Sequence, residues 1–236
     1  MNSENGTKGF SIGGGIRYAV MSDIHANAVA LSKSVDEARA YGAEAFVCLG
    51  DFVGYGPDPN GALALSREVF GDQAILGNND AALLYEISSN SESPRIRFDA
   101  ENIDWLKSRP PLIRRGSALF LHGDVRREAA VLKAGFGYVF RPEDVERVFS
   151  AVDGMGINIV FVGHTHEPMV WRLKEDGKAE LFEEARICAG PTDRYVINVG
   201  TVGRPRGVAC ASYAIVDELP DGNFEVELRM LEFDYA

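Results

Sequence analysis

Asn158-Ile-Val-Phe-Val-Gly-His164-Thr-His166 is the stretch of the chain that decides its fold. Its apolar run of β-branched and aromatic residues predicts a fully buried strand, which ends at a glycine followed by two histidines. Histidine is the commonest metal ligand among side chains. The stretch therefore predicts a buried strand that carries two metal-binding side chains at its carboxyl end.

The same pattern, an apolar run with polar residues at its end, occurs four more times. The polar residues are Asp23 and His25 after 18–21, Asp51 after 46–49, Asn78, Asn79 and Asp80 after 74–76, and His122 and Asp124 after 119–121. All four histidines of the chain fall in these five motifs, which coincidence explains poorly. Because open α/β sheets form sites beyond the carboxyl ends of their strands, we expect these side chains to meet at one edge.

The ligand types in these motifs are carboxylate, amide carbonyl and imidazole. No thiolate is among them, so the set favours Mn, Fe or Zn over a cysteine-rich structural zinc cage. Residues i and i+2 of an extended segment point to the same side. Two pairs are therefore each expected to act as a two-point clamp, namely Asp23 with His25 and His164 with His166.

Composition narrows the class of protein. The chain has 236 residues, 46% hydrophobic and 25% charged, which predicts one α/β domain over 16–236 after a flexible leader at 1–15. A formal charge of -11 argues against a broad nucleic-acid surface, and no apolar run of about 18 residues predicts a membrane span. Cys48, Cys188 and Cys210 form no CxxC pair and are expected to be buried reduced thiols of a cytoplasmic protein.

The order of the predicted elements indicates two sheets. Strands at 17–22, 44–49 and 73–76 alternate with helices at 28–41, 62–70, 81–87 and 99–108. The remainder is β-rich, with hairpins at 112–121 and 168–183, a helix at 142–152, and strands at 158–162, 195–199, 211–216 and 224–231. Each sheet needs a cover for its apolar face, so we expect two packed sheets with helices outside.

The five motifs resemble, in order and spacing, those of the calcineurin-like metallophosphoesterase family, in its bacterial predicted phosphoesterase type. They are Asp23-x-His25, Gly50-Asp51, Gly77-Asn78-x-Asp80, His122-Gly123 and Gly163-His164-Thr-His166, and Asn198-Val-Gly-Thr-Val-Gly203 resembles the closing loop of the family. Five motifs in one order are far more specific than any one of them. The resemblance implies an α/β fold, a four-layer α/β/β/α sandwich of two mixed β-sheets flanked by helices.

The resemblance also implies two divalent metal ions, which would be Mn, Fe, Zn or Ni. One ion would be bound by Asp23, His25 and His166, the other by Asn78, His122 and His164, and Asp51 would bridge them. An ion pair of this kind holds a phosphoryl oxygen and generates a hydroxide. The implied reaction is hydrolysis of a phosphodiester or phosphomonoester by a dimetal-bound hydroxide, with the catalytic residues Asp51, Asn78, Asn79 and His122.

Asn79 departs from the family pattern, which commonly has histidine at this position. An amide can donate a hydrogen bond to a phosphate oxygen, but it cannot titrate near neutral pH. Asn79 is therefore expected to bind substrate without acting as the general acid. The leaving group then either needs little protonation or takes a proton from water, Tyr55 or Asp124.

Contacts with substrate beyond the metal ligands rest on weaker signals. Arg204 and Arg206 follow the closing loop, and their planar guanidinium groups suit a phosphate, although a solvated loop explains them nearly as well. Tyr55 is predicted either to shape the pocket or only to pack. Asp80 is predicted either to cap the helix that follows it or to orient His122 or Asn79.

Other functions stay open at this point. A dinucleoside polyphosphate hydrolase or a serine/threonine protein phosphatase uses related chemistry. A non-catalytic scaffold that retains metal would be expected to lose ligands, and here every ligand position is filled. The expected partner is a small phosphate-ester substrate, without a membrane, and edge strands near the carboxyl terminus leave an oligomer open.

Overall fold

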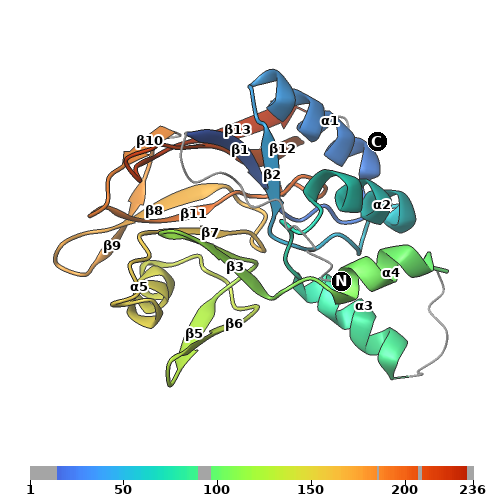
Figure 1. The fold of residues 1–236 in the computed structure, drawn as a ribbon, viewed down its shortest axis with the longest axis horizontal. Coiled ribbons are helices and arrows are strands. Elements are labelled where there is room, and N and C mark those ends of the chain that lie inside the picture. The colour runs from blue at the N-terminus through green and yellow to red at the C-terminus, as the bar shows by residue number, and fades with distance from the viewer. Residues whose placement is uncertain (1–14, 90–96, 185, 207–208, 233–236) are drawn as a thin grey trace, which may run out of the picture.

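Two mixed β-sheets flanked by five helices make up the part of this computed structural model that is described, residues 15–89, 97–184, 186–206 and 209–232 (Figure 1). The predicted α/β sandwich is confirmed. The leader predicted at 1–15 lies outside the described residues except for Gly15. The assignment of 16–236 to a single domain stays a prediction.

The first sheet has five strands, β1 (Ile16–Met21), β2 (Ala45–Cys48), β10 (Arg186–Ala189), β12 (Cys210–Glu218) and β13 (Phe224–Glu232). Their order is β10-β13-β12-β1-β2. Only β1 and β2 pair in parallel, and the other pairs are antiparallel.

The second sheet has six strands, β3 (Leu112–Arg115), β4 (Ala118–Leu121), β7 (Ile159–Val162), β8 (Met169–Leu173), β9 (Ala179–Phe182) and β11 (Arg194–Asn198). Their order is β3-β4-β7-β11-β8-β9. The central strands β4, β7 and β11 are parallel, whereas the outer pairs are antiparallel. Parallel strands end at the same edge, so each sheet gathers the carboxyl ends of its parallel strands there.

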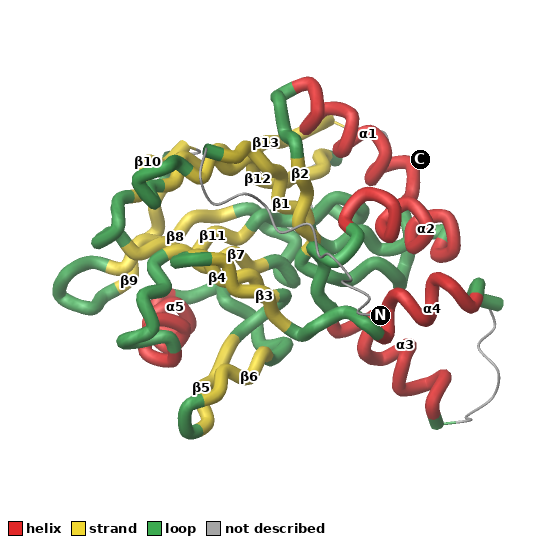
Figure 2. The backbone as a smooth tube through the Cα atoms, viewed as in Figure 1, coloured by secondary structure: helices red, strands yellow, loops and turns green. Residues whose placement is uncertain are grey.

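The five helices are α1 (Ala28–Ala40), α2 (Pro59–Phe70), α3 (Asn78–Ser88), α4 (Ala100–Lys107) and α5 (Pro142–Ala151). The first four share a buried apolar cluster with the outer face of the first sheet, and α5 covers the outer face of the second (Figure 2). Within the described ranges no helix is long and apolar enough to span a membrane. Helices, sheet, sheet and helix form the four layers.

Alternation along the strands builds the core between these layers. In β1, Tyr18 and Val20 pack toward the second sheet, whereas Ala19 and Met21 pack toward the helices. Each face of a central strand is therefore buried, which explains why such strands have continuous apolar sequences.

The start of α3 brings two polar residues into the site. The helix begins at Asn78, three residues before the predicted start at 81, so Asn78 and Asn79 lie in its first turn. The preceding segment, predicted as a strand at 73–76, makes only one bridge, between Ala74 and Cys48. After this bridge the segment no longer pairs with β2, and the N–H of Leu76 donates instead to the carbonyl of Pro110 at 3.1 Å.

Three strands were not predicted from the sequence. A two-stranded sheet joins β5 (Val125–Glu128) and β6 (Val131–Ala134), and β10 forms an edge of the first sheet. These strands are short; β5 and β6 are largely exposed, and β10 buries only alternate residues, so they lack the continuous apolar runs of the central strands. The expectation of three buried thiols is also wrong, since Cys48 is buried, Cys188 faces solvent from β10, and Cys210 is half-buried.

Candidate metal centre

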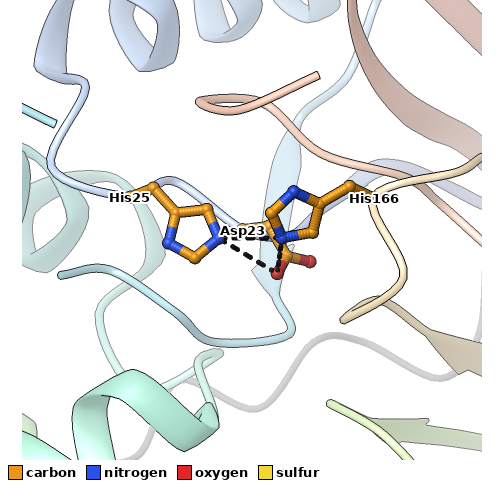
Figure 3. Close-up of side chains that lie close together, drawn as sticks. All are labelled: Asp23, His25 and His166. Atoms are coloured by element: carbon orange, nitrogen blue, oxygen red, sulfur yellow. Dashed lines mark hydrogen bonds and ion pairs between the residues drawn. The ribbon is translucent and has the colours of Figure 1, made fainter. Parts of the chain in front are cut away.

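The polar residues at the strand ends form two groups. Within each group, one potential ligand atom per residue lies within 4.8 Å of the others. The first group is Asp23, His25 and His166 (Figure 3), and the second is Asp51, His122 and His164. Each group combines residues that follow strands of both sheets, so both groups lie where the two sheets meet.

Three potential ligand atoms of the first group face one another. The Nε2 atoms of His25 and His166 are 2.9 Å apart, and Asp23 Oδ1 is 3.2 Å from the Nε2 of His166 and 3.5 Å from that of His25. The Nδ1 atoms lie against backbone carbonyls, 3.2 Å from Val53 and 2.8 Å from Arg204. A carbonyl only accepts, so Nδ1 carries the hydrogen and the Nε2 of a neutral ring presents a lone pair.

The first group attracts positive charge. Asp23 Oδ1 is buried and has no hydrogen-bond partner in the described part of the chain. Burial favours the neutral form of Asp23, but protonated imidazoles at His166 and His25 outweigh it and hold the pKa of this carboxyl well below its usual range; a bound cation would supply the same charge in place of the ring protons. A buried carboxylate oxygen that converges with two imidazole nitrogens fits a divalent cation, which would displace the ring protons.

Asp51, a member of the second group, also approaches the first. Its Oδ2 is 3.5 Å from the Nε2 of His122 and 3.8 Å from the Nε2 of His25. His122 donates from Nδ1 to the carbonyl of Leu49 at 2.8 Å, and its Nε2 is 3.0 Å from Asn78 Oδ1. The geometry therefore brings together all of the predicted ligands, and the bridging role of Asp51 stays a prediction.

The histidines differ in how their surroundings affect protonation. Burial works to lower the pKa of His25, but Asp23 and then Asp51 more than offset it, so this pKa is raised. Burial, followed by the nearby His122, lowers the pKa of His164. His164 is therefore held in the neutral form that binds a metal.

Most residues of the two groups have a left-handed backbone. Of the eight non-glycine residues with positive φ in the described ranges, seven lie in the loops of this site, namely Asp23, His25, Ala26, Asp51, Tyr55, His164 and His166. Such conformations cost free energy and occur where the surrounding structure enforces them. The extended geometry predicted for the two clamps is therefore wrong. Asp23 and His25 still share one group, whereas His164 and His166 divide between the two groups, as the family resemblance implies.

Hydrogen bonds from three loops hold Asp23 in place. Its Oδ2 accepts from Ser22 Oγ at 2.6 Å and from the N–H of His164 at 2.9 Å, and Thr201 Oγ1 donates to its carbonyl at 2.9 Å. Thr201 belongs to the closing loop predicted from the sequence. The loops approach so closely that a Cβ on Gly163 would lie 2.0 Å from Ser22 Oγ.

Asp80 organises the loop that carries Asp51. Its carboxylate accepts four backbone N–H groups, from Asp51 at 2.8 Å, Phe52 at 2.9 Å, Val53 at 3.3 Å and Gly77 at 3.0 Å. Burial, and then the charge of Asp51, raises the pKa of Asp80 to about 7. Of the two predicted roles, capping of α3 is observed together with anchoring of this loop, rather than orientation of His122 or Asn79.

Asn79 is directed at Asp51. Its Nδ2 donates to Asp51 Oδ2 at 2.6 Å, and its backbone N–H donates to Asp51 Oδ1 at 2.8 Å. The side chain thus lies in the site, at the position where the family commonly has histidine.

Of the residues predicted to contact substrate, Tyr55 and Arg204 lie beside the first group, and Arg206 lies at a cavity. Tyr55 packs edge-on against His25, with 4.9 Å between ring centroids, and the guanidinium carbon of Arg204 lies 3.6 Å from the centre of the Tyr55 ring. Arg206 lines a cavity next to the second group. Asp124, a predicted proton source, accepts from the N–H of Gly137 at 3.0 Å and so holds the segment after β6.

Two aromatic residues of the site were missed. Tyr138 stacks on His164, with centroids 4.3 Å apart and planes inclined by 14°, and Phe136 packs edge-on against His122 at 6.0 Å. Their alternation with Phe140 between two predicted elements is the signal that could have found them.

Comparison with known proteins gives the same assignment. Residues 16–219 match the family model described as calcineurin-like phosphoesterase superfamily domain. The uncharacterized protein MJ0912 of Methanocaldococcus jannaschii is 32% identical over 230 residues, covering 92% of this chain and 87% of its own.

Among solved structures, a metallophosphoesterase from Sphaerobacter thermophilus is similar with a TM-score of 0.72 and 30% identity, over 93% of this chain and 89% of its own. The hypothetical protein PH1004 from Pyrococcus horikoshii shares the fold, with a TM-score of 0.63 and 16% identity over 93% and 89% of the two chains. The family match covers most of the chain, and the residues at its strand ends form the two groups that the family pattern implies. The chain therefore belongs to the calcineurin-like phosphoesterase superfamily.

Proposed function

We propose that this protein is a dinuclear metal-dependent phosphoesterase that hydrolyses a phosphodiester or phosphomonoester of modest size. One observation carries the proposal: the buried Oδ1 of Asp23 and the Nε2 atoms of His25 and His166 lie within 3.5 Å of one another, as the ligand atoms of one cation would. Family membership supports the same chemistry. The expected partner is a small phosphate ester, and the metals are Mn, Fe, Zn or Ni.

The chain provides a rigid frame for two ions. Asp23, His25 and His166 would hold one ion, and His122, His164 and Asn78 the other, with Asp51 between them. When bound, two such ions activate water and neutralise charge on the phosphoryl oxygens. The ligands are fixed beforehand, since three of the four imidazoles are oriented by hydrogen bonds that they donate to backbone carbonyls.

Polar groups on the accessible side position the substrate. Asn79 donates to Asp51 and has a second N–H for a phosphate oxygen, and Arg204 lies nearby on Tyr55. Asn79 supplies no proton near neutral pH, because an amide does not titrate there. The protein is therefore expected to favour esters whose leaving group departs without protonation.

The test combines elemental analysis with an assay of bis(p-nitrophenyl) phosphate hydrolysis in Mn, Ni, Zn and Mg. Asp51→Asn should lower kcat at least about 100-fold, because it removes a charge from the centre of the site. Asp58→Asn is the matched control, since Asp58 is an exposed helix cap that asparagine replaces well, and its activity should equal that of the parent. Two bound metals without hydrolysis of any ester would refute the proposal and favour a non-catalytic scaffold.

A further inference from the structure

A cavity opens beside the second group of the metal centre. Its volume is about 390 Å³, within the range of about 300–1,000 Å³ that is typical of small-molecule sites. Its lining includes Tyr138, Phe140, Arg141, Thr165, Glu167 and Arg206. None of these is a predicted metal ligand, so the cavity extends the site beyond the reacting phosphate.

The cavity and the metal centre share their walls. The ring of Tyr138 lies parallel to His164, at 4.3 Å between centroids and 14° between planes. Along the loop after β7, His164 and His166 belong to the two metal groups, whereas Thr165 and Glu167 line the cavity. A molecule whose phosphate lay at the metal groups would therefore have its organic part next to this cavity.

The lining combines aromatic faces with unpaired charges. Tyr138 and Phe140 are 52% and 46% exposed, so part of each ring is accessible to a ligand. Arg141, Arg206 and Glu167 make no side-chain hydrogen bond or ion pair with any residue in the described ranges. The cavity thus offers flat apolar surface together with free donors and a free acceptor.

The wall that carries the aromatics is fixed in place. Asp144 in the first turn of α5 accepts the N–H of Phe140 at 3.2 Å and that of Arg141 at 3.0 Å. Upstream, Asp124 accepts the N–H of Gly137 at 3.0 Å. The backbone of the segment between β6 and α5 is therefore held at both ends, and the Tyr138 ring is held by its stacking on His164.

We infer that this cavity binds the nucleobase of a nucleotide ester, so the substrate class of the proposed phosphoesterase is a nucleotide. This inference rests on the proposed function. A base offers a flat face for Tyr138 and Phe140, and its polar edge suits Arg206 and Glu167. An aliphatic chain would leave the charged groups unpaired, and a bare polyphosphate would leave the aromatic faces unused.

The experiment uses two diesters with the same leaving group on the metal-loaded full chain. One is the p-nitrophenyl ester of adenosine 5′-monophosphate, and the other is methyl p-nitrophenyl phosphate. The parent should prefer the nucleoside ester at least about tenfold in kcat/KM, because base stacking adds binding energy that a methyl group cannot supply. Phe140→Ala should remove most of this preference, and Phe140→Tyr should keep it. Tyr85→Ala removes an exposed aromatic of α3 that does not line the cavity, and it should not change the ratio.

Equal kcat/KM for the two esters in the parent, or a ratio unaffected by Phe140→Ala, would overturn the inference while leaving the proposed function intact. If neither these esters nor bis(p-nitrophenyl) phosphate is hydrolysed, the proposed function fails. Calorimetry of nucleotide binding then tests the inference separately. The parent should then bind adenosine 5′-monophosphate about tenfold more tightly than Phe140→Ala does, with inorganic phosphate binding alike in both. Equal affinity of the two proteins for the nucleotide would refute the base site.

Discussion

At the scale of single residues, Asn79 determines which leaving groups this centre can release. Asn79→His introduces an imidazole that can protonate an alkoxide, so turnover of an alkyl phosphate should rise about tenfold or more relative to bis(p-nitrophenyl) phosphate. The measurement is kcat for both esters. Asn79→Gln is the control, because it keeps an amide and should produce no such rise. An unchanged ratio in Asn79→His would mean that proton donation does not limit the reaction.

The ligands and their division between two groups were predictable from the sequence and its family resemblance, but the backbone geometry that presents them was not. The motifs around His164 and His166 identify both side chains, because metal ligands follow a buried strand in a recognisable pattern. The same two residues serve different groups, as the resemblance implied, but positive φ at each departs from the extended geometry expected from their i and i+2 spacing. Short-range sequence patterns describe extended and helical segments well, whereas left-handed turns of aspartate and histidine depend on the loops around them.

At the scale of elements, the first turn of α3 controls the loop that carries Asp51. Asp80→Ala would leave four buried backbone N–H groups without an acceptor, so the free energy of unfolding should fall by about 3 kcal/mol or more. Asp58→Ala is the matched control at the start of α2, where one N–H is capped in an exposed position, and it should cost about 1 kcal/mol. Urea denaturation measures both, and equal losses would show that the Asp80 network adds nothing to stability.

Elements with strong periodicity were predicted, and those without it were missed. The helices and the core strands follow apolar patterns. Asn27, an asparagine that caps α1, and Pro59, a proline in the first turn of α2, are residue types typical of helix starts, although the apolar pattern of α2 alone begins only at 62. The pairing of β5 with β6 depends on the cover of α5 rather than on an apolar run. The segment after Asn158 shows the opposite case, because burial on both faces gives β7 an unmistakable sequence.

At the scale of the whole molecule, each group of ligands joins the two sheets. Asp23 and Asp51 follow strands of the first sheet, and His122, His164 and His166 follow strands of the second. Removal of metal by EDTA should therefore lower Tm by about 5–10 °C, as expected for loss of an ion present at about 100 times its Kd. Thermal unfolding with and without chelator measures this shift. His166→Ala should show a smaller shift, and an unchanged Tm in the parent after verified metal loss would contradict the prediction.

The four-layer architecture was predictable because it follows from two amphipathic requirements, apolar faces on both sheets and apolar stripes on the helices. The order of strands within each sheet was not, since strands far apart in the chain, such as β1 and β12, pair directly. Such pairing depends on long-range contacts that no local pattern encodes.

The left-handed backbone of the ligand loops limits how this centre can be transplanted into other scaffolds. Asp23, His25, Asp51, His164 and His166 each occupy a conformation that costs about 1 kcal/mol or more, so together they amount to roughly 5 kcal/mol of strain that neighbouring packing must offset. A designer who grafted only the side chains onto relaxed hairpins would obtain the right donors aimed in the wrong directions. Copying the centre means copying its loops, including the glycines and the threonine that clamp them.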